Sequence, residues 1–228
     1  MTARYQSLEH LAAKGTHAIP SLDFLRLHWF LTSDNPNDCI FILQDAKDAQ
    51  SAQKPYTADR PINQQPATHP PVSSMNISID LLDQYQSDWL DAHGPHADAD
   101  DFHDQNDPMC PKFDSEGCLS RCCGQDRPGP GPRLEIVADD GQFVSIGMYV
   151  NSVHAWLRGM DGMLRAAEGV MSCWPLDTEF QFIVPVFDFS CLMLESTETW
   201  TSEDYVREWE GAADMARRLY PDAASSRA

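Results

Sequence analysis

Basic residues are scarce in this 228-residue sequence, in which 16 lysines and arginines stand against 35 aspartates and glutamates, for a formal net charge of −19. Binding to DNA or RNA requires a basic surface that displaces counterions from phosphates, and docking on an anionic membrane requires one as well. We therefore expect neither a nucleic-acid partner nor a membrane partner. An acidic surface is instead complementary to a basic patch on another protein.

Long apolar runs are also missing. No segment reaches the roughly 18–20 apolar residues of a transmembrane helix, and the N-terminus has no apolar run of the kind found in secretory signals. We therefore expect a cytoplasmic or nuclear protein, a setting in which thiols stay reduced. The seven cysteines agree with this expectation, because an odd number cannot all pair within one chain.

Enzyme signatures are absent: the sequence contains no G-x-S-x-G, no G-x-x-x-x-G-K, no G-x-G-x-x-G and no H-E-x-x-H. His154 lies at helical spacing from Arg158, Asp161 and Arg165. This face is compatible with a catalytic base beside an anion clamp, or with an exposed helix face that an Asp161–Arg165 pair supports. Because no nucleophile or acid motif accompanies His154, we predict no catalytic residue.

Apolar patterning predicts secondary structure near the N-terminus. Residues 3–14 match a short helix, and residues 22–32 alternate with the period of a strand. A turn-forming loop at 33–38 then leads into a second apolar run at 39–43, which predicts a β-hairpin. A helix over 21–32 is the alternative, because the apolar density satisfies either period.

The C-terminal part has a regular order of predicted elements. Asp139-Asp140-Gly141 separates two strand-like runs and predicts a tight hairpin. The predicted elements are strands at 134–138 and 142–146, a helix over 148–168, strands at 180–187 and 189–194, and a helix over 202–219. This β-β-α-β-β-α order predicts an α+β fold with a largely antiparallel sheet and helices on one face, which the N-terminal hairpin joins or leaves separate.

Two stretches are poor in large apolar residues and together hold eleven of the sixteen prolines, so we expect both to be flexible. Between them, apolar residues at helical spacing predict a helix that Gly94-Pro95 ends. The predicted organisation is 1–43, helix and hairpin; 44–75, flexible linker; 76–92, helix; 93–133, acidic flexible segment rich in His, Cys and Pro; 134–221, α+β module; and 222–228, tail.

A cluster of histidines and cysteines in 93–123 carries zinc-ligand chemistry. It holds His93, His96 and His103, followed by cysteines in the order C-x7-C-x3-C-C. Thiolates and imidazoles are the ligands that zinc prefers, and a metal can fold a segment that has no core. The predicted ligands are Cys110, Cys118, Cys122, Cys123 and His103. The spacing differs from that of common zinc sites, and adjacent cysteines rarely share one tetrahedral metal, so reduced thiols and solvated histidines on a loop are the alternative.

Three functions follow from these observations. The first is a non-catalytic acidic protein that acts through contacts with a protein bearing a basic patch, without a cofactor. The second is a zinc-binding protein that uses the His/Cys cluster. The third is a small enzyme whose site is assembled from residues far apart in sequence, which no motif reveals.

Overall fold

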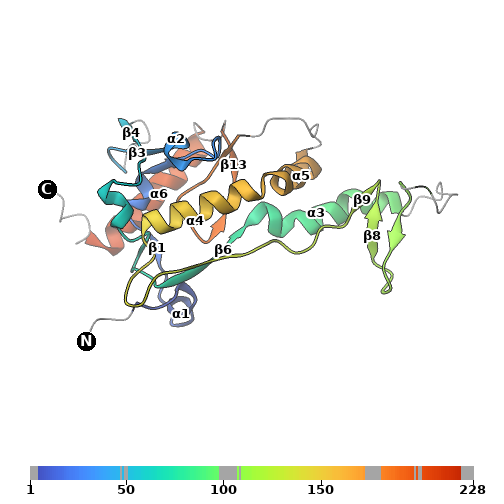
Figure 1. Cartoon of the computed structure of the whole chain (residues 1–228), viewed down its shortest axis with the longest axis horizontal. Coiled ribbons are helices and arrows are strands. Elements are labelled where there is room, and N and C mark those ends of the chain that lie inside the picture. Colours follow the sequence, from blue (N-terminus) through green and yellow to red (C-terminus); the bar gives the residue numbers. More distant parts are fainter. Residues whose placement is uncertain are drawn as a thin grey trace. The chain divides into compact units, whose positions relative to one another are not determined.

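The computed structural model describes residues 5–46, 48, 51–97, 107, 109–172, 181–197, 199 and 202–221. Helices alternate with several small antiparallel sheets, which confirms the predicted α+β class (Figure 1). The strands form separate sheets in the orders β1-β5, β10-β6-β12, β11-β13, β2-β3-β4 and β7-β8-β9, and not the one sheet that the C-terminal pattern predicts. In the part of the chain that is described, no helix has both the length and the apolarity needed to cross a bilayer.

The chain forms two compact units. Unit 1 comprises 1–78, 133–160 and 180–228, and unit 2 comprises 79–132 and 161–179. The elements of unit 1 are α1 (Leu8–Ala13), β1 (Ile19–Pro20), η1 (Phe24–Arg26), β2 (Leu27–Trp29), α2 (Pro36–Cys39), β3 (Ile40–Leu43), β4 (Gln53–Pro55), η2 (Pro61–Gln64), β5 (Thr68–His69), β6 (Ser74–Ile79, its last residue in unit 2), β10 (Leu134–Val137), α4 (Ile146–Gly159), β11 (Phe182–Ile183), β12 (Cys191–Leu192), β13 (Glu195–Ser196) and α6 (Glu203–Leu219).

The predicted N-terminal hairpin forms, but its first strand is shorter than 22–32, because residues 24–26 form η1. β2 pairs antiparallel with β3, with Leu27 opposite Ile42 and Trp29 opposite Ile40. The connection holds the short helix α2, for which the Asn35 side chain accepts the backbone N–H of Asn37 as an N-cap. The hairpin also reaches the C-terminal segment, because the backbone N–H of Val184 donates to the Trp29 carbonyl at 2.9 Å. Residues 29–31 thus join the backbone that leads into and out of β11.

Residues 44–75 differ from the flexible linker that their composition predicts. They contribute β4, η2 and β5, and Tyr56, Ile62, Ala67 and Val72 are buried. The larger apolar side chains are spaced so that they reach the core of unit 1, and the polar residues Asn63 and Thr68 are buried with them. Mean composition cannot reveal this arrangement, because burial depends on which residues point inward and not on their number.

The hairpin predicted around Asp139–Gly141 is wrong in its pairing. The turn exists, with Gln142 N–H donating to Asp139 O at 2.9 Å and Gly141 at φ 77°. However, β10 pairs with β6, and the chain after the turn bonds to the segment before β6: Val144 N–H donates to Val72 O at 2.8 Å. The two arms therefore do not pair with each other. Both pair with residues 65–77, which lie much farther away in the sequence.

Of the two predicted C-terminal helices, the first is interrupted and the second forms over the predicted range. The helix expected over 148–168 is two helices, α4 and α5 (Asp161–Ser172), which are interrupted at Met160 where unit 1 gives way to unit 2. The last helix, α6, forms as predicted with Ser202 as its N-cap. It buries Tyr205, Trp209, Ala213 and Ala216, and the Trp209 indole N–H donates to the Leu25 carbonyl at 2.8 Å.

Unit 2 is built on α3 (Asp80–Ala97), α5 and the meander of β7 (Lys112–Phe113), β8 (Leu119–Cys122) and β9 (Gln125–Asp126). α5 packs along α3, and β8 contacts α3 as well. One buried cluster of unit 2 consists of Trp89, Leu119 and Cys122, with Tyr85 and Val170 packed against it, and Leu82 and Leu164 are buried as well. The ordered strands at 112–126 differ from the flexible segment predicted over 93–133.

Candidate metal centre

Two histidines on α3 face the same side of the helix. The helix predicted over 76–92 begins only at Asp80, because residues 76–79 belong to β6, and it continues past the expected stop at Gly94-Pro95 to Ala97. His93 and His96 are three residues apart on this last turn, so their side chains are neighbours. The His93 ring is buried against Trp89, whereas His96 is exposed.

Two cysteines lie at the tip of the β8–β9 hairpin. Cys122 opposite Gln125 closes the strands, so Cys123 and Gly124 form a two-residue turn. Both have positive φ, 51° for Cys123 and 76° for Gly124, which is the conformation of a type I′ turn. This turn bends the backbone between Cys122 and Cys123 so that both Sγ atoms lie on the same side, 3.6 Å apart.

The four side chains converge on one point. One ligand atom from each of His93, His96, Cys122 and Cys123 lies within 4.8 Å of all the others. The His96 Nδ1 to Cys123 Sγ distance is 3.2 Å. Around a tetrahedral zinc with Zn–S near 2.3 Å and Zn–N near 2.0–2.1 Å, ligand atoms lie about 3.3–3.8 Å apart. The arrangement is therefore close to a zinc tetrahedron and needs a contraction of about 1.5 Å at most.

The protonation properties of the group follow from its burial. Burial, together with the neighbouring Cys123 thiol, raises the pKa of Cys122 to about 11. Burial and the adjacent His96 lower the pKa of His93, while a hydrogen bond to the Gln125 side chain opposes this shift. His93 is thus neutral, as a metal ligand must be, and its buried Nδ1 has no hydrogen-bond partner among the described residues. An orphaned buried nitrogen indicates a missing partner.

A cavity of about 520 Å³ in unit 2 borders the centre. It is lined by residues of α3, β9 and α5, among them His93, Gln125 and Val170. Of the four ligands, His93 is the one in its lining, so the cavity gives solvent access to that histidine.

Of the predicted ligands, Cys122 and Cys123 belong to this group, and Cys110 and Cys118 do not. Cys110 is buried. Cys118 is exposed and lies at the other end of β8 from Cys122 and Cys123. His103 lies outside the described residues. The histidines in the group are instead His93 and His96. The signal that could have identified them is the H-x-x-H spacing, which places both rings on one helix face once the helix is allowed to pass Pro95.

Adjacent cysteines rarely share one metal, but here the Cys-Cys-Gly turn has two positive φ angles. The backbone thereby reverses within two residues, which an extended or helical Cys-Cys pair cannot do. All six cysteines that the structure describes are free thiols.

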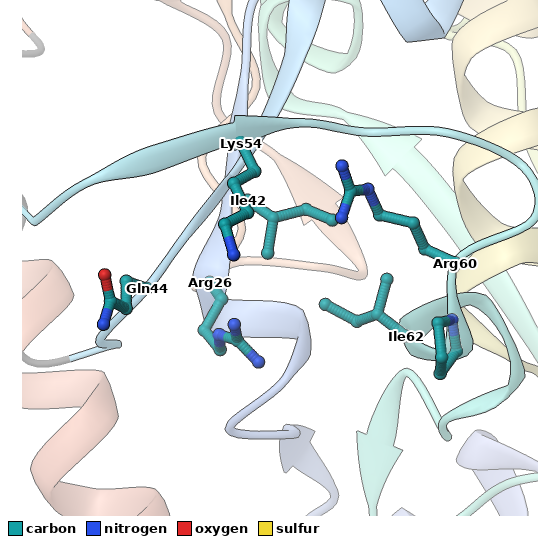
Figure 2. Close-up of a pocket in the computed structure, with 7 residues that line it drawn as sticks. Arg26, Ile42, Gln44, Lys54, Arg60 and Ile62 are labelled. Carbon is teal, nitrogen blue, oxygen red and sulfur yellow. The ribbon is translucent and has the colours of Figure 1, made fainter.

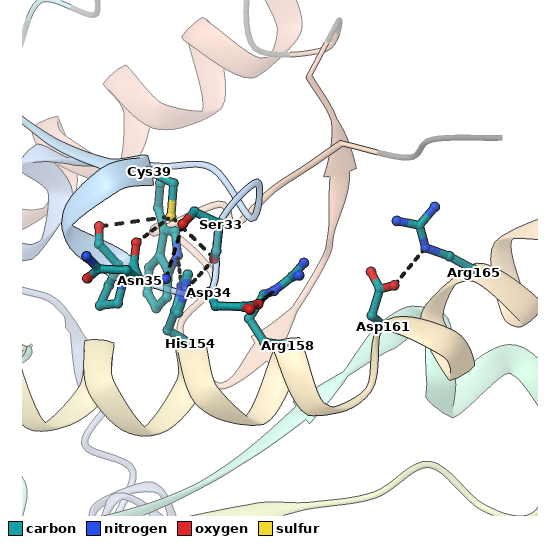
Figure 3. A network of polar contacts seen from close by, with 10 residues as sticks. Ser33, Asp34, Asn35, Cys39, His154, Arg158, Asp161 and Arg165 are labelled. Atoms are coloured by element: carbon teal, nitrogen blue, oxygen red, sulfur yellow. Dashed lines mark hydrogen bonds and ion pairs between the residues drawn. The ribbon is translucent and has the colours of Figure 1, made fainter. Parts of the chain in front are cut away.

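His154 is a structural residue in this fold. Its ring is buried, and Nε2 lies 2.9 Å from the Ser33 carbonyl (Figure 3). Arg158 pairs with Asp34 at 2.8 Å, and Arg165 pairs with Asp161 at 2.8 Å, as expected for an i,i+4 helix pair. Both ring nitrogens of His154 are occupied, so the residue has no lone pair available to act as a base.

Comparisons with protein families, with curated proteins and with solved structures found no match for this chain.

Proposed function

We propose that the protein binds one zinc ion through His93, His96, Cys122 and Cys123, and that the metal holds unit 2 together. The observation that carries the proposal is the convergence of four ligand atoms of the types zinc prefers within 4.8 Å. The separations of 3.2 Å and 3.6 Å are those of neighbouring ligands around one metal, and the buried Nδ1 of His93 has no other described partner.

The architecture of unit 2 supports a structural role for this metal. The buried cluster of Trp89, Leu119 and Cys122 includes one of the four ligands, so the metal would lie directly beside packed apolar side chains. Modules of this size commonly need a metal or disulfides because their cores bury too little apolar surface. A zinc ion would tie the end of α3 to the β8–β9 turn.

Four protein ligands close a tetrahedral coordination sphere. Catalytic zinc sites keep one position for water or substrate, whereas structural sites do not. A His2Cys2 set therefore supports a structural zinc. Contacts with a protein that bears a basic patch stay a prediction, and their support is the formal net charge of −19.

The test is metal analysis of protein purified without added chelator. We expect about one equivalent of zinc per chain in the native protein and less than about a tenth of an equivalent in His96→Asn. His96 is exposed, so this substitution removes a ligand with little effect on packing. Cys118→Ser is the matched control, because it removes an exposed cysteine of the same meander that does not belong to the group.

Two results would overturn the proposal. One is native protein with neither bound zinc nor the capacity to take it up after reduction of its thiols. The other is loss of zinc in Cys118→Ser together with its retention in His96→Asn, which would favour the ligands predicted from the sequence alone. Substitution with cobalt adds a spectroscopic check, because thiolate-to-cobalt bands appear only when cysteine sulfur is coordinated.

A further inference from the structure

Three of the sixteen basic side chains line one cavity in unit 1. The cavity measures about 240 Å³ and lies among η1, the β3–β4 pair and η2 (Figure 2). Its walls are formed by Arg26, Ile42, Gln44, Lys54, Arg60, Pro61 and Ile62. No acidic residue is among them, although acids outnumber bases 35 to 16 in the chain. The lining of the cavity is therefore basic, whereas the protein as a whole is acidic.

Backbone carbonyls hold the two guanidinium groups and leave further donors free for a ligand. Arg26 Nε donates to the Leu43 carbonyl at 2.9 Å, and Arg60 Nε donates to the Pro55 carbonyl at 2.9 Å. A guanidinium has five N–H donors, so most of its donors remain on the terminal nitrogens. Figure 2 shows Lys54 extending from β4 toward the space that Arg26 and Ile62 also face.

Nearby carboxylates offset only part of this charge. Asp23 pairs with Arg26 at 3.3 Å, and Asp45 also interacts favourably with Arg26. Asp59 lies near Arg60, but its carboxylate accepts a hydrogen bond of 2.6 Å from the Thr57 hydroxyl and is not part of the lining. Among the described residues, Lys54 and Arg60 form no ion pair. The excess positive charge is therefore mainly that of Lys54 and Arg60.

The net charge of the whole protein does not prevent anion binding at this place. At physiological ionic strength the Debye length is about 8 Å, so acids elsewhere on the surface are largely screened from a ligand in the cavity. The nearby cations are not screened to the same degree. The local charge consequently dominates the potential that a bound anion experiences.

We propose that this cavity binds a small phosphomonoester. Cations that approach from three separate elements match the several oxygens and the double charge of a phosphate better than a flat, singly charged carboxylate. Ile42, Pro61 and Ile62 supply an apolar wall for the organic part of the ligand. The volume is below the roughly 300–1,000 Å³ of drug-sized sites, so the ligand is small.

Calorimetric titration with phenyl phosphate, inorganic phosphate, benzoate and phenol tests the proposal. We expect saturable 1:1 binding of phenyl phosphate that is tighter than the binding of the other three compounds. Lys54→Met should weaken it about tenfold, because it removes an exposed cation and keeps the length of the side chain. Lys14→Met is the matched control: it removes the same charge from an exposed position of α1's C-cap and should change the affinity less than about twofold.

Several outcomes would overturn the inference. Absence of saturable phenyl phosphate binding up to about 10 mM at low salt excludes the site. Equal weakening by Lys54→Met and Lys14→Met indicates a response to net charge alone. If benzoate binds as tightly as phenyl phosphate, the site does not prefer phosphate over carboxylate. If inorganic phosphate binds as tightly as phenyl phosphate, the apolar wall does not contribute to binding. Unchanged thermal unfolding of both variants confirms that the comparison concerns folded protein.

Discussion

The indole N–H of Trp29 donates a hydrogen bond of 3.2 Å to Nδ1 of His154, across 125 residues of sequence. An indole N–H can only donate and the Ser33 carbonyl can only accept, so the His154 ring carries its proton on Nε2 and is neutral. The two rings are also stacked, with an interplanar angle of 23°. This pair connects the N-terminal hairpin to α4 and specifies one tautomer of a buried histidine.

The neutral state of His154 predicts a pH-dependent contribution to stability. Burial lowers the pKa of His154 below its ordinary value of 6.5. The unfolded chain therefore takes up a proton at a higher pH than the folded protein, and the free energy of unfolding falls as the pH drops from 6.5 toward the folded-state pKa. Urea unfolding between pH 7 and 5 should show a weaker pH dependence in His154→Asn than in the native protein.

The comparison with a variant is needed because burial also lowers the pKa of His28, to about 4, and of His69, so these histidines contribute to the same slope. At pH 7, we expect His154→Asn to destabilise unit 1 by about 1–3 kcal/mol, because the Ser33 carbonyl or the Trp29 indole loses its partner. An identical pH dependence in the two proteins would show that His154 is not held neutral.

Removal of the metal should loosen unit 2 selectively. Chelation is expected to accelerate hydrogen exchange at amides of the β7–β9 meander, such as Arg127 N–H, which donates to Ser120 O at 2.8 Å. Amides in unit 1, such as Val184 N–H bonded to Trp29 O at 2.9 Å, should keep their protection. Mass-spectrometric exchange with and without chelator measures both, and a uniform change in the two units would contradict a local role for the metal.

Gly124 should affect metal affinity through its backbone conformation. Its φ of 76° at the second position of the Cys-Cys-Gly turn is strained for any residue with a Cβ, so Gly124→Ala should cost about 1–2 kcal/mol. Because this turn orients both cysteines, we expect zinc affinity to fall roughly fivefold or more. Gly117→Ala provides the control: φ is 80° there, but the turn lies at the opposite end of β8. Competition with a chromophoric chelator compares the two, and equal losses would refute a specific role for the Cys-Cys-Gly turn.

Gly131 lies where the backbone of unit 2 passes close to α3. A Cβ at this position would stand about 3.0 Å from the carbonyl group of Leu82 and would also meet the Asp83 carboxylate. Gly131→Ala should therefore destabilise unit 2 by about 1–3 kcal/mol. Gly129→Ala has open space around it and should change stability by less than about 0.5 kcal/mol. Thermal unfolding followed by tryptophan fluorescence measures both, and a neutral Gly131→Ala would contradict the close approach.

Local patterns in the sequence predicted several elements correctly. The hairpin of β2 and β3 follows from apolar alternation around a turn-forming loop, and α6 matches the helix predicted over 202–219. Each of these signals acts over a few residues. Cys122 and Cys123 were likewise found among the candidate ligands because their side-chain chemistry is unusual wherever they lie.

Long-range pairing could not be predicted in the same way. The turn at Gly141 is encoded locally, yet its two arms pair with residues 65–77, which the sequence assigned to a flexible linker and to the start of a helix. Composition also indicated flexibility over 44–75, because it averages over residues whose burial depends on direction. The range of α3 also differed from the predicted helix over 76–92, since it starts after β6 at Asp80 and continues past Pro95 to Ala97.

The amino-acid pattern alone was therefore sufficient for the α+β class, the acidic character and the presence of zinc-ligand chemistry between residues 93 and 123, since these are properties of residue type and short-range spacing. Tertiary folding decided which ligands meet. It set His93 and His96 on one helical turn, folded the Cys-Cys-Gly turn against them, and gathered Arg26, Lys54 and Arg60 around one cavity. These groupings bring together residues up to 34 positions apart in the sequence (26 to 60). They depend on how the segments pack against one another, which a local sequence pattern cannot predict.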